Sequence, residues 1–100
     1  MYRATTPTLT LTLPQGFSLD NAEHVYVTIR QGPVSVTKME DTLVIDENTI
    51  EVYLEQAETL EFAAGSVMIQ LNVTYAGGQR YCTDIVRVNV KENLIPEVLE

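Results

Sequence analysis

Two side chains in this 100-residue sequence are natural candidates for nucleophilic or acid–base chemistry: the single histidine, His24, and the single cysteine, Cys82. A hydrolytic triad needs a nucleophile, an imidazole base and a third group that orients the base. No motif of that kind flanks His24, so we interpret it as a partly exposed residue at the start of a strand. Cys82 has no second cysteine to pair with, and the pattern around it predicts a buried thiol beside Val73 that behaves as a small hydrophobic side chain. We therefore predict no catalytic residues and a protein that is not an enzyme.

The carboxylates are the other groups that could bind a ligand, and most of them lie in one half of the chain. No Lys or Arg occurs between Lys38 and Arg80, whereas eight acidic residues fall in that interval. The loop Asp46-Glu47-Asn48 could offer oxygen atoms to a hard cation, but it lacks the glycine and the bidentate glutamate of a calcium-binding loop. We interpret the segment as a strongly negative, solvated surface, with a weak cation site as the alternative, and predict no metal and no cofactor. The eight residues are Glu40, Asp41, Asp46, Glu47, Glu51, Glu55, Glu58 and Glu61.

The overall charge argues against two further classes of partner. Six Lys and Arg against fourteen Asp and Glu give a formal net charge of −8. This is the wrong sign for a surface that must neutralise phosphates or adhere to anionic lipid, so we expect neither nucleic acid nor a membrane as partner. No apolar run approaches the roughly 18 residues of a spanning helix. The opening residues 1–7 lack the apolar core of a secretory signal, and we expect the chain to stay in the cell that makes it.

The spacing of apolar residues predicts a protein built from strands. Val, Ile and Thr account for 30 of the 100 residues, and such β-branched side chains favour a pleated sheet over a helix. In residues 8–13 threonine and leucine alternate, which in an extended chain places all three leucines on one face.

The first predicted hairpin joins residues 24–30 to residues 34–36. Both segments alternate apolar and polar side chains, and Gln31-Gly32 lies between them as a turn signal. A two-residue loop at these positions sets Ile29 opposite Val34, so that the apolar faces of the two strands coincide. A second hairpin follows in the same way, with the four-residue connection 46–49 between residues 43–45 and 50–54.

The last hairpin has the strongest turn signal and joins residues 66–76 to residues 79–90. Gly77-Gly78 tolerates the positive φ angles that a type I′ turn requires at both positions. This turn sets Val73 opposite Cys82 and Ile69 opposite Val86. Asp84 then falls on the apolar face, so we expect a β-bulge near residues 84–86 that turns Asp84 outward and Ile85 inward.

Seven strands separated by turns in about 100 residues predict an all-β fold, a seven-stranded antiparallel immunoglobulin-like β-sandwich. One short helical turn is predicted within residues 55–62. The sandwich domain is expected to span residues 1–91, with residues 92–100 as a C-terminal tail that packs on the domain or on a partner. The apolar residues of the tail, which have roughly helical spacing, are Leu94, Ile95, Val98 and Leu99.

Four segments together resemble a known group of proteins: the opening residues 2–14, the strand 25–31, and the run 52–62 leading to 65–71. They are similar to small phage and prophage proteins of Gram-positive gut bacteria, related to the N-terminal domain of the phage baseplate upper protein. The similarity covers residues 2 to about 91, and Ala4 stands where such openings are expected to have glycine. The resemblance implies a non-enzymatic tail or baseplate component that docks against other phage structural proteins. It implies location in the bacterial host cytoplasm before assembly and in the virion afterwards, and it carries no site residue.

A carbohydrate- or cell-surface-binding module is the alternative function. Four tyrosines are expected to be exposed, and tyrosine is a frequent anchor in sugar sites and protein interfaces, although alternate tyrosines are also ordinary strand composition. The open strand edges and the tail also permit a homo-oligomer. The four residues are Tyr2, Tyr26, Tyr53 and Tyr81.

Overall fold

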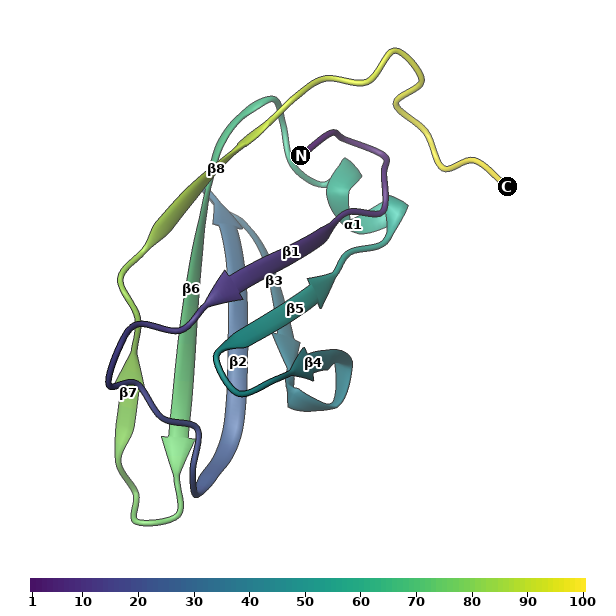
Figure 1. Ribbon diagram of the computed structural model, residues 1–100. Helices are drawn as coiled ribbons and strands as arrows, with labels where there is room; N and C mark the ends of the chain where they lie inside the picture. The colour runs from purple at the N-terminus through teal and green to yellow at the C-terminus, as the bar shows by residue number, and fades with distance from the viewer.

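Eight strands form two antiparallel sheets that face each other in the computed structural model, which describes residues 1–100 (Figure 1). The prediction of an all-β sandwich is confirmed. All seven predicted strands are present, and the last of them is divided into two. The elements are β1 (Thr8–Thr12), β2 (Ala22–Gln31), β3 (Val34–Met39), a 3₁₀ turn (Glu40–Thr42), β4 (Leu43–Ile45), β5 (Thr49–Tyr53), α1 (Gln56–Leu60), β6 (Gly65–Tyr75), β7 (Arg80–Cys82) and β8 (Val86–Val90).

The two sheets differ in width. The smaller sheet has the strand order β1-β5-β4. The larger sheet has the order β3-β2-β6, and both β7 and β8 pair with β6, along different parts of its length. In Figure 1 the smaller sheet lies in front, and its strands cross those of the larger sheet obliquely. The smaller sheet therefore has three strand positions where the larger sheet has four.

The core lies between the sheets because each strand turns alternate apolar side chains inward. β2 and β6 supply seven of its members, and the fully buried Phe62, just after α1, adds an aromatic ring. Burying one such side chain contributes about 1.5–3 kcal/mol relative to leaving it in water. The cluster comprises Leu13, Val25, Val27, Ile29, Leu43, Ile50, Val52, Leu54, Phe62, Val67, Ile69, Leu71, Val73 and Val90.

The first hairpin, β2–β3, is present, but its predicted loop is wrong. The loop is Gly32-Pro33, so Gln31 pairs with Val34 and Ile29 faces Val36 rather than Val34. Gly32 has a φ of +56°, as the first loop position of a type II′ turn requires, and proline supplies the negative φ of the second. The predicted register would have placed Pro33 in the ladder, where its missing N–H would leave a bond unmade.

The second hairpin, β4–β5, has the predicted register, with Ile45 opposite Ile50 and Leu43 opposite Val52. The predicted helical turn is also present as α1. It begins with a capping box in which Glu55 and Glu58 each bond the other's backbone N–H. The side chain of Lys38 on β3 reaches this helix and lies 2.7 Å from the Glu58 carboxylate.

The third hairpin has a different turn from the one predicted. Tyr75 pairs with Gln79 around a three-residue loop, residues 76–78, and within it only Gly78 has a positive φ, of +84°. The Gly78 N–H donates to the Tyr75 carbonyl at 2.9 Å, as in a type I turn followed by a bulge. This loop shifts the register by one residue, so Cys82 lies opposite Asn72 and is exposed. The predicted buried position beside Val73 is therefore wrong.

An irregular segment, residues 83–85, separates β7 from β8 and compensates that shift. Beyond it Ile69 faces Val86 and Val67 faces Val88, as predicted. Asp84 is exposed, in agreement with the expected bulge. Ile85 does not turn inward, because the irregular segment only restores the register that the turn displaced, and 49% of its surface remains exposed.

The opening segment bonds to the end of β8. Backbone bonds join Arg3 to Lys91 at 3.0 Å and Lys91 to Met1 at 2.7 Å. The next residue, Ala4, is buried and has a φ of +60°, in the left-handed region that favours glycine. Glycine would adopt this conformation without the steric cost that the Cβ atom of Ala4 imposes.

Replacing Gly78 with alanine should lower the free energy of unfolding by about 1 kcal/mol, because a Cβ atom disfavours the left-handed conformation. Gly77→Ala is the matched control. Its φ is not positive, and its Cβ would meet only the Gln79 side chain at an ordinary 3.5 Å, so stability should be unchanged or slightly higher. Chemical denaturation measures both variants, and equal losses would contradict the three-residue loop and indicate a type I′ turn.

Candidate interaction surfaces

His24 and Glu40 form a hydrogen-bonded pair that joins β2 to the 3₁₀ turn. His24 Nδ1 lies 2.7 Å from Glu40 Oε1, and Glu40 Oε2 accepts the Val25 N–H at 3.1 Å. The bond with Glu40 raises the pKa of His24. The bonds from His24 and Val25 lower the pKa of Glu40 to about 2. The His24 side chain is half-exposed near the start of β2, as predicted, and its contacts link two neighbouring elements.

The other residues considered for chemistry lie at the surface. Cys82 is on the outer face of the larger sheet, and Asp46 and Glu47 are exposed in the β4–β5 loop, where Asp46 accepts the Glu47 N–H at 2.8 Å. Nowhere do three or more His, Cys, Asp or Glu side chains converge in a way that could hold a metal ion. No helix is both long enough and apolar enough to cross a bilayer.

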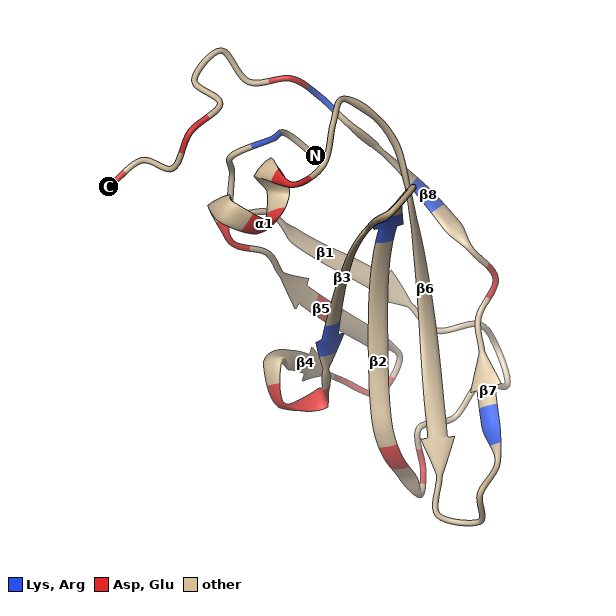
Figure 2. Cartoon of the chain, turned by 180° about the vertical axis from the view of Figure 1, so that it is seen from behind, with Lys and Arg blue, Asp and Glu red and all other residues tan.

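Negative charge gathers around the smaller sheet and α1. Of the eight acidic residues between Lys38 and Arg80, only Glu40 and Glu58 have a histidine or lysine partner. Burial raises the pKa of Glu58, but the hydrogen bonds from Lys38 and from a backbone N–H outweigh it, so the net shift is downward. The other six project from the 3₁₀ turn, the β4–β5 hairpin and the region of α1, where Figure 2 shows acidic residues in red.

The outer face of the larger sheet carries the opposite charge. Arg30, Arg80 and Arg87 all lie on this face, and none forms an ion pair. Arg30 and Arg87 flank Met68 on either side, and Arg80 Nη2 donates to Asn72 Oδ1 at 3.0 Å. Three of the six basic residues therefore share one face of the molecule, whereas Arg3 and Lys38 lie beside the carboxylates of Glu92 and Glu58.

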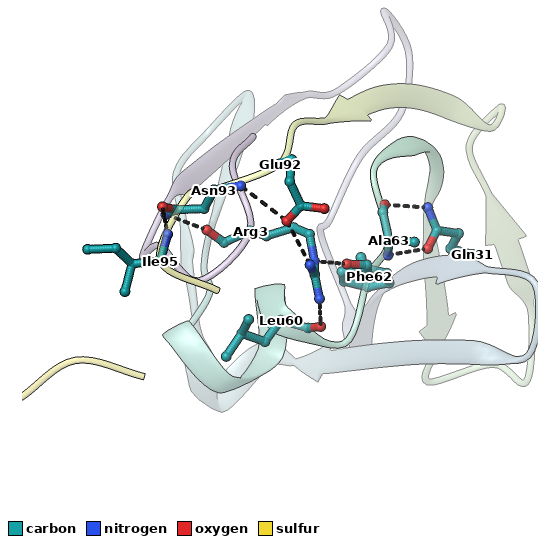
Figure 3. A network of polar contacts seen from close by, with 8 residues as sticks. All are labelled: Arg3, Gln31, Leu60, Phe62, Ala63, Glu92, Asn93 and Ile95. Atoms are coloured by element: carbon teal, nitrogen blue, oxygen red, sulfur yellow. Dashed lines mark hydrogen bonds and ion pairs between the residues drawn. The ribbon is translucent and has the colours of Figure 1, made fainter. Parts of the chain in front are cut away.

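Arg3 connects the opening segment, α1 and the C-terminal tail (Figure 3). Its guanidinium donates to the carbonyl oxygens of Phe62 at 2.6 Å and Leu60 at 3.1 Å, which lie at the end of α1. It also lies 2.7 Å from the Glu92 carboxylate, and this bond lowers the pKa of Glu92. The Asn93 side chain donates to the Arg3 carbonyl at 3.0 Å. The Arg3 side chain thus bonds carbonyl groups at the end of α1 and the carboxylate of Glu92. Together with the Arg3 carbonyl, it holds Glu92 and Asn93, the first two residues of the tail, in place.

Two glutamine side chains bind backbone in the same bidentate way. The Gln31 amide donates to the Ala63 carbonyl at 2.9 Å and accepts its N–H at 2.8 Å. The Gln56 amide does the same with Leu99, at 3.0 and 2.7 Å. Sequence analysis missed these contacts and those of Arg3, because their partners lie 32 to 90 residues away and leave no local pattern.

The C-terminal tail packs against neither sheet (Figure 1). Leu94 is 99% exposed, and the other three aliphatic residues of the tail are 49–56% exposed. The tail forms no helix despite the roughly helical spacing of these residues. It is therefore an irregular, bent apolar segment that is bonded at Asn93 and Leu99 and exposed between them.

A second feature is a groove between the loop of residues 14–21 and the β6–β7 hairpin. Its volume is about 750 Å³, and Phe17, Tyr75 and Tyr81 contribute aromatic rings to its wall. The two tyrosine rings meet edge to face with centroids 5.6 Å apart, and the Tyr75 hydroxyl donates to the Ser18 carbonyl at 2.5 Å. Tyr81 is the only one of the four tyrosines considered above that lines this groove. Its polar residues include Gln15, Asp20, Asn21 and Gln79.

Comparisons with family models, with characterised proteins and with solved structures found no significant match to this chain.

The His24–Glu40 pair should make stability depend on pH. The folded pKa of His24 is raised, so its contribution is complete below 6.5 and is lost as the pH rises through the folded pKa. The folded pKa of Glu40 is lowered to about 2, so its contribution is complete above 4.5 and is lost as the pH falls toward 2. His24→Gln should therefore lower the melting temperature most between pH 4.5 and 6.5 and converge with wild type at alkaline pH. Circular dichroism melts across this range measure the difference, and a deficit independent of pH would contradict the pair.

Proposed function

We propose that this protein is a non-enzymatic phage or prophage component that docks against other tail or baseplate proteins and is retained in the virion. The main support for a docking role is the exposure of the apolar residues in the C-terminal tail. Four aliphatic side chains close together in a chain of this size form a surface that is costly in water and is typical of a contact with another protein.

The charge distribution supports the same role. A negative surface around α1 and the smaller sheet, with a positive outer face on the larger sheet, gives two distinct faces for neighbouring subunits. Complementary potentials steer such contacts and fix their orientation. The phage assignment itself rests on the resemblance carried by residues 2–14, 25–31, 52–62 and 65–71.

Mass spectrometry of particles purified after prophage induction tests the proposal. We expect peptides of this chain in the particles, in a constant ratio to known tail proteins and well above an abundant cytoplasmic host protein that is measured as a contamination control. Presence in the lysate with consistent absence from the particles would overturn the virion assignment and leave at most an assembly factor.

The groove lined by Phe17, Tyr75 and Tyr81 favours a second candidate, a carbohydrate-binding module. Aromatic rings beside amide and carboxylate groups are the surfaces to which sugar rings bind, by stacking and by hydrogen bonds. The exposed Tyr81 offers the most accessible ring.

Glycan-array binding by the intact protein tests this second candidate. Tyr81→Ala should abolish any specific signal, whereas Tyr53→Ala, an equally large change at an exposed tyrosine outside the groove, should not. Absence of a specific signal from wild type, or equal losses in both variants, would remove the candidate.

A further inference from the structure

The free edge of β1 differs from the other edges of the sandwich. β3 ends the larger sheet on one side and turns Lys38 toward Glu58, β4 has only three residues, and residues 83–85 interrupt the opposite edge of the larger sheet. Inward charges, short strands and irregularities all hinder pairing with another chain. β1 has none of them, since its sequence Thr-Leu-Thr-Leu-Thr is uncharged and regular.

The backbone of β1 can accept a further strand. The Leu13 N–H just beyond β1 donates to the Asn48 carbonyl at 2.8 Å, and alternation along the antiparallel pair assigns the bonds with β5 to odd-numbered residues. The N–H and C=O groups of Thr8, Thr10 and Thr12 therefore point away from β5. The smaller sheet has no further strand on that side.

An apolar groove runs along the same edge. Its volume is about 230 Å³, and its lining includes Leu11 and Leu13 on one side and Ile69, Leu71 and Val86 on the other. Val86 pairs with the inward-facing Ile69 yet is 50% exposed, because no strand of the smaller sheet lies over β8 (Figure 1). One added strand beside β1 would cover the groove and bond the free backbone groups of β1.

We propose that residues 94–100 of a second copy of this chain form that strand, antiparallel to β1. The inference deepens the proposed docking function and rests on it. Pro96 has no N–H, so it must occupy a position whose N–H would point away from β1. This alternation places Leu94, Pro96 and Val98 over the groove, next to Leu11 and Val86. It directs the N–H groups of Ile95, Glu97 and Leu99 to β1, with their side chains on the outer, solvated face. On docking, these N–H groups exchange the bonds that they donate within one chain, to Asn93, Ile95 and Gln56, for bonds to β1 of the second copy.

A second copy fits the groove better than the chain's own tail. Glu92 and Asn93, at the start of the tail, are bonded to Arg3, so residues 94–100 continue past α1 and away from β8 of the same chain (Figures 1 and 3). Direct pairing of two β1 edges is disfavoured, since β8 lies beyond β1 on that side and the two β8 strands would meet. Because donor and acceptor are different surfaces, the contact is heterologous and generates rings or filaments.

Sedimentation velocity of the full chain tests the proposal. We expect wild type to form dimers and larger species as its concentration rises. Leu94→Asp with Val98→Asp removes the groove-facing side chains, and Thr10→Pro removes the central N–H of the free edge. Each of these variants should be monomeric, with a loss of affinity of at least about tenfold.

Matched controls separate the contact from general effects. Ile95→Asp with Leu99→Asp adds the same charge on the opposite face of the tail and should weaken association much less. Thr10→Val keeps the N–H and should associate like wild type. Val86→Asp, in the groove, replaces Thr10→Pro if circular dichroism shows that the proline variant does not fold. Equal effects of the two tail variants would overturn the proposed alternation and, with it, the proposal.

Mixing the monomeric variants gives the decisive result. The tail variant keeps a working groove and the groove variant keeps a working tail, so an equimolar mixture should give a 1:1 heterodimer and nothing larger. A mixture that stays monomeric, or a wild type that is monomeric at every concentration, overturns the inference. These outcomes are independent of the particle analysis above, because a monomeric chain found in virions would refute this contact and leave the proposed function standing.

Discussion

The two sheets that enclose the hydrophobic core differ in width, and the rest of the structure depends on this constraint. Alternate side chains on β2 and β6 form a wide apolar face, and the smaller sheet covers only part of it. Burial of that face stabilises the fold, and its uncovered margin near Val86 leaves apolar surface in contact with water. The same feature therefore accounts both for the stability of the domain and for the apolar surface that is exposed along one edge.

The end of the sandwich near α1 is held by hydrogen bonds rather than by further strands. Thr59 is fully buried, and its hydroxyl donates to the Thr5 carbonyl at 2.9 Å while accepting the Thr5 N–H at 3.0 Å. Arg3 and Gln31 bind backbone groups of the segment between α1 and β6. A five-residue helix would not be stable alone, so these long-range bonds, together with the buried Phe62, fix its position.

The sequence was sufficient for the fold class, because a period of two in side-chain polarity is a local signal that identifies each strand. The register of Ile45 with Ile50 also followed from matching apolar faces. Turn types did not follow, since Gly77-Gly78 is compatible with more than one loop, and the choice between them moved Cys82 from one face of the sheet to the other. Arg3 and Gln56 were not identified because their roles depend on carbonyl groups brought close only by folding.

The uneven distribution of the unpaired charges affects how the molecule approaches other charged molecules. Three unpaired arginines on one side and a group of acidic side chains on the other give the protein a permanent dipole moment as well as its net charge. In the electric field of a charged partner the protein experiences a torque, so it rotates into alignment before the two molecules make contact. Added salt shortens the range over which this alignment operates, to roughly 8 Å at physiological ionic strength.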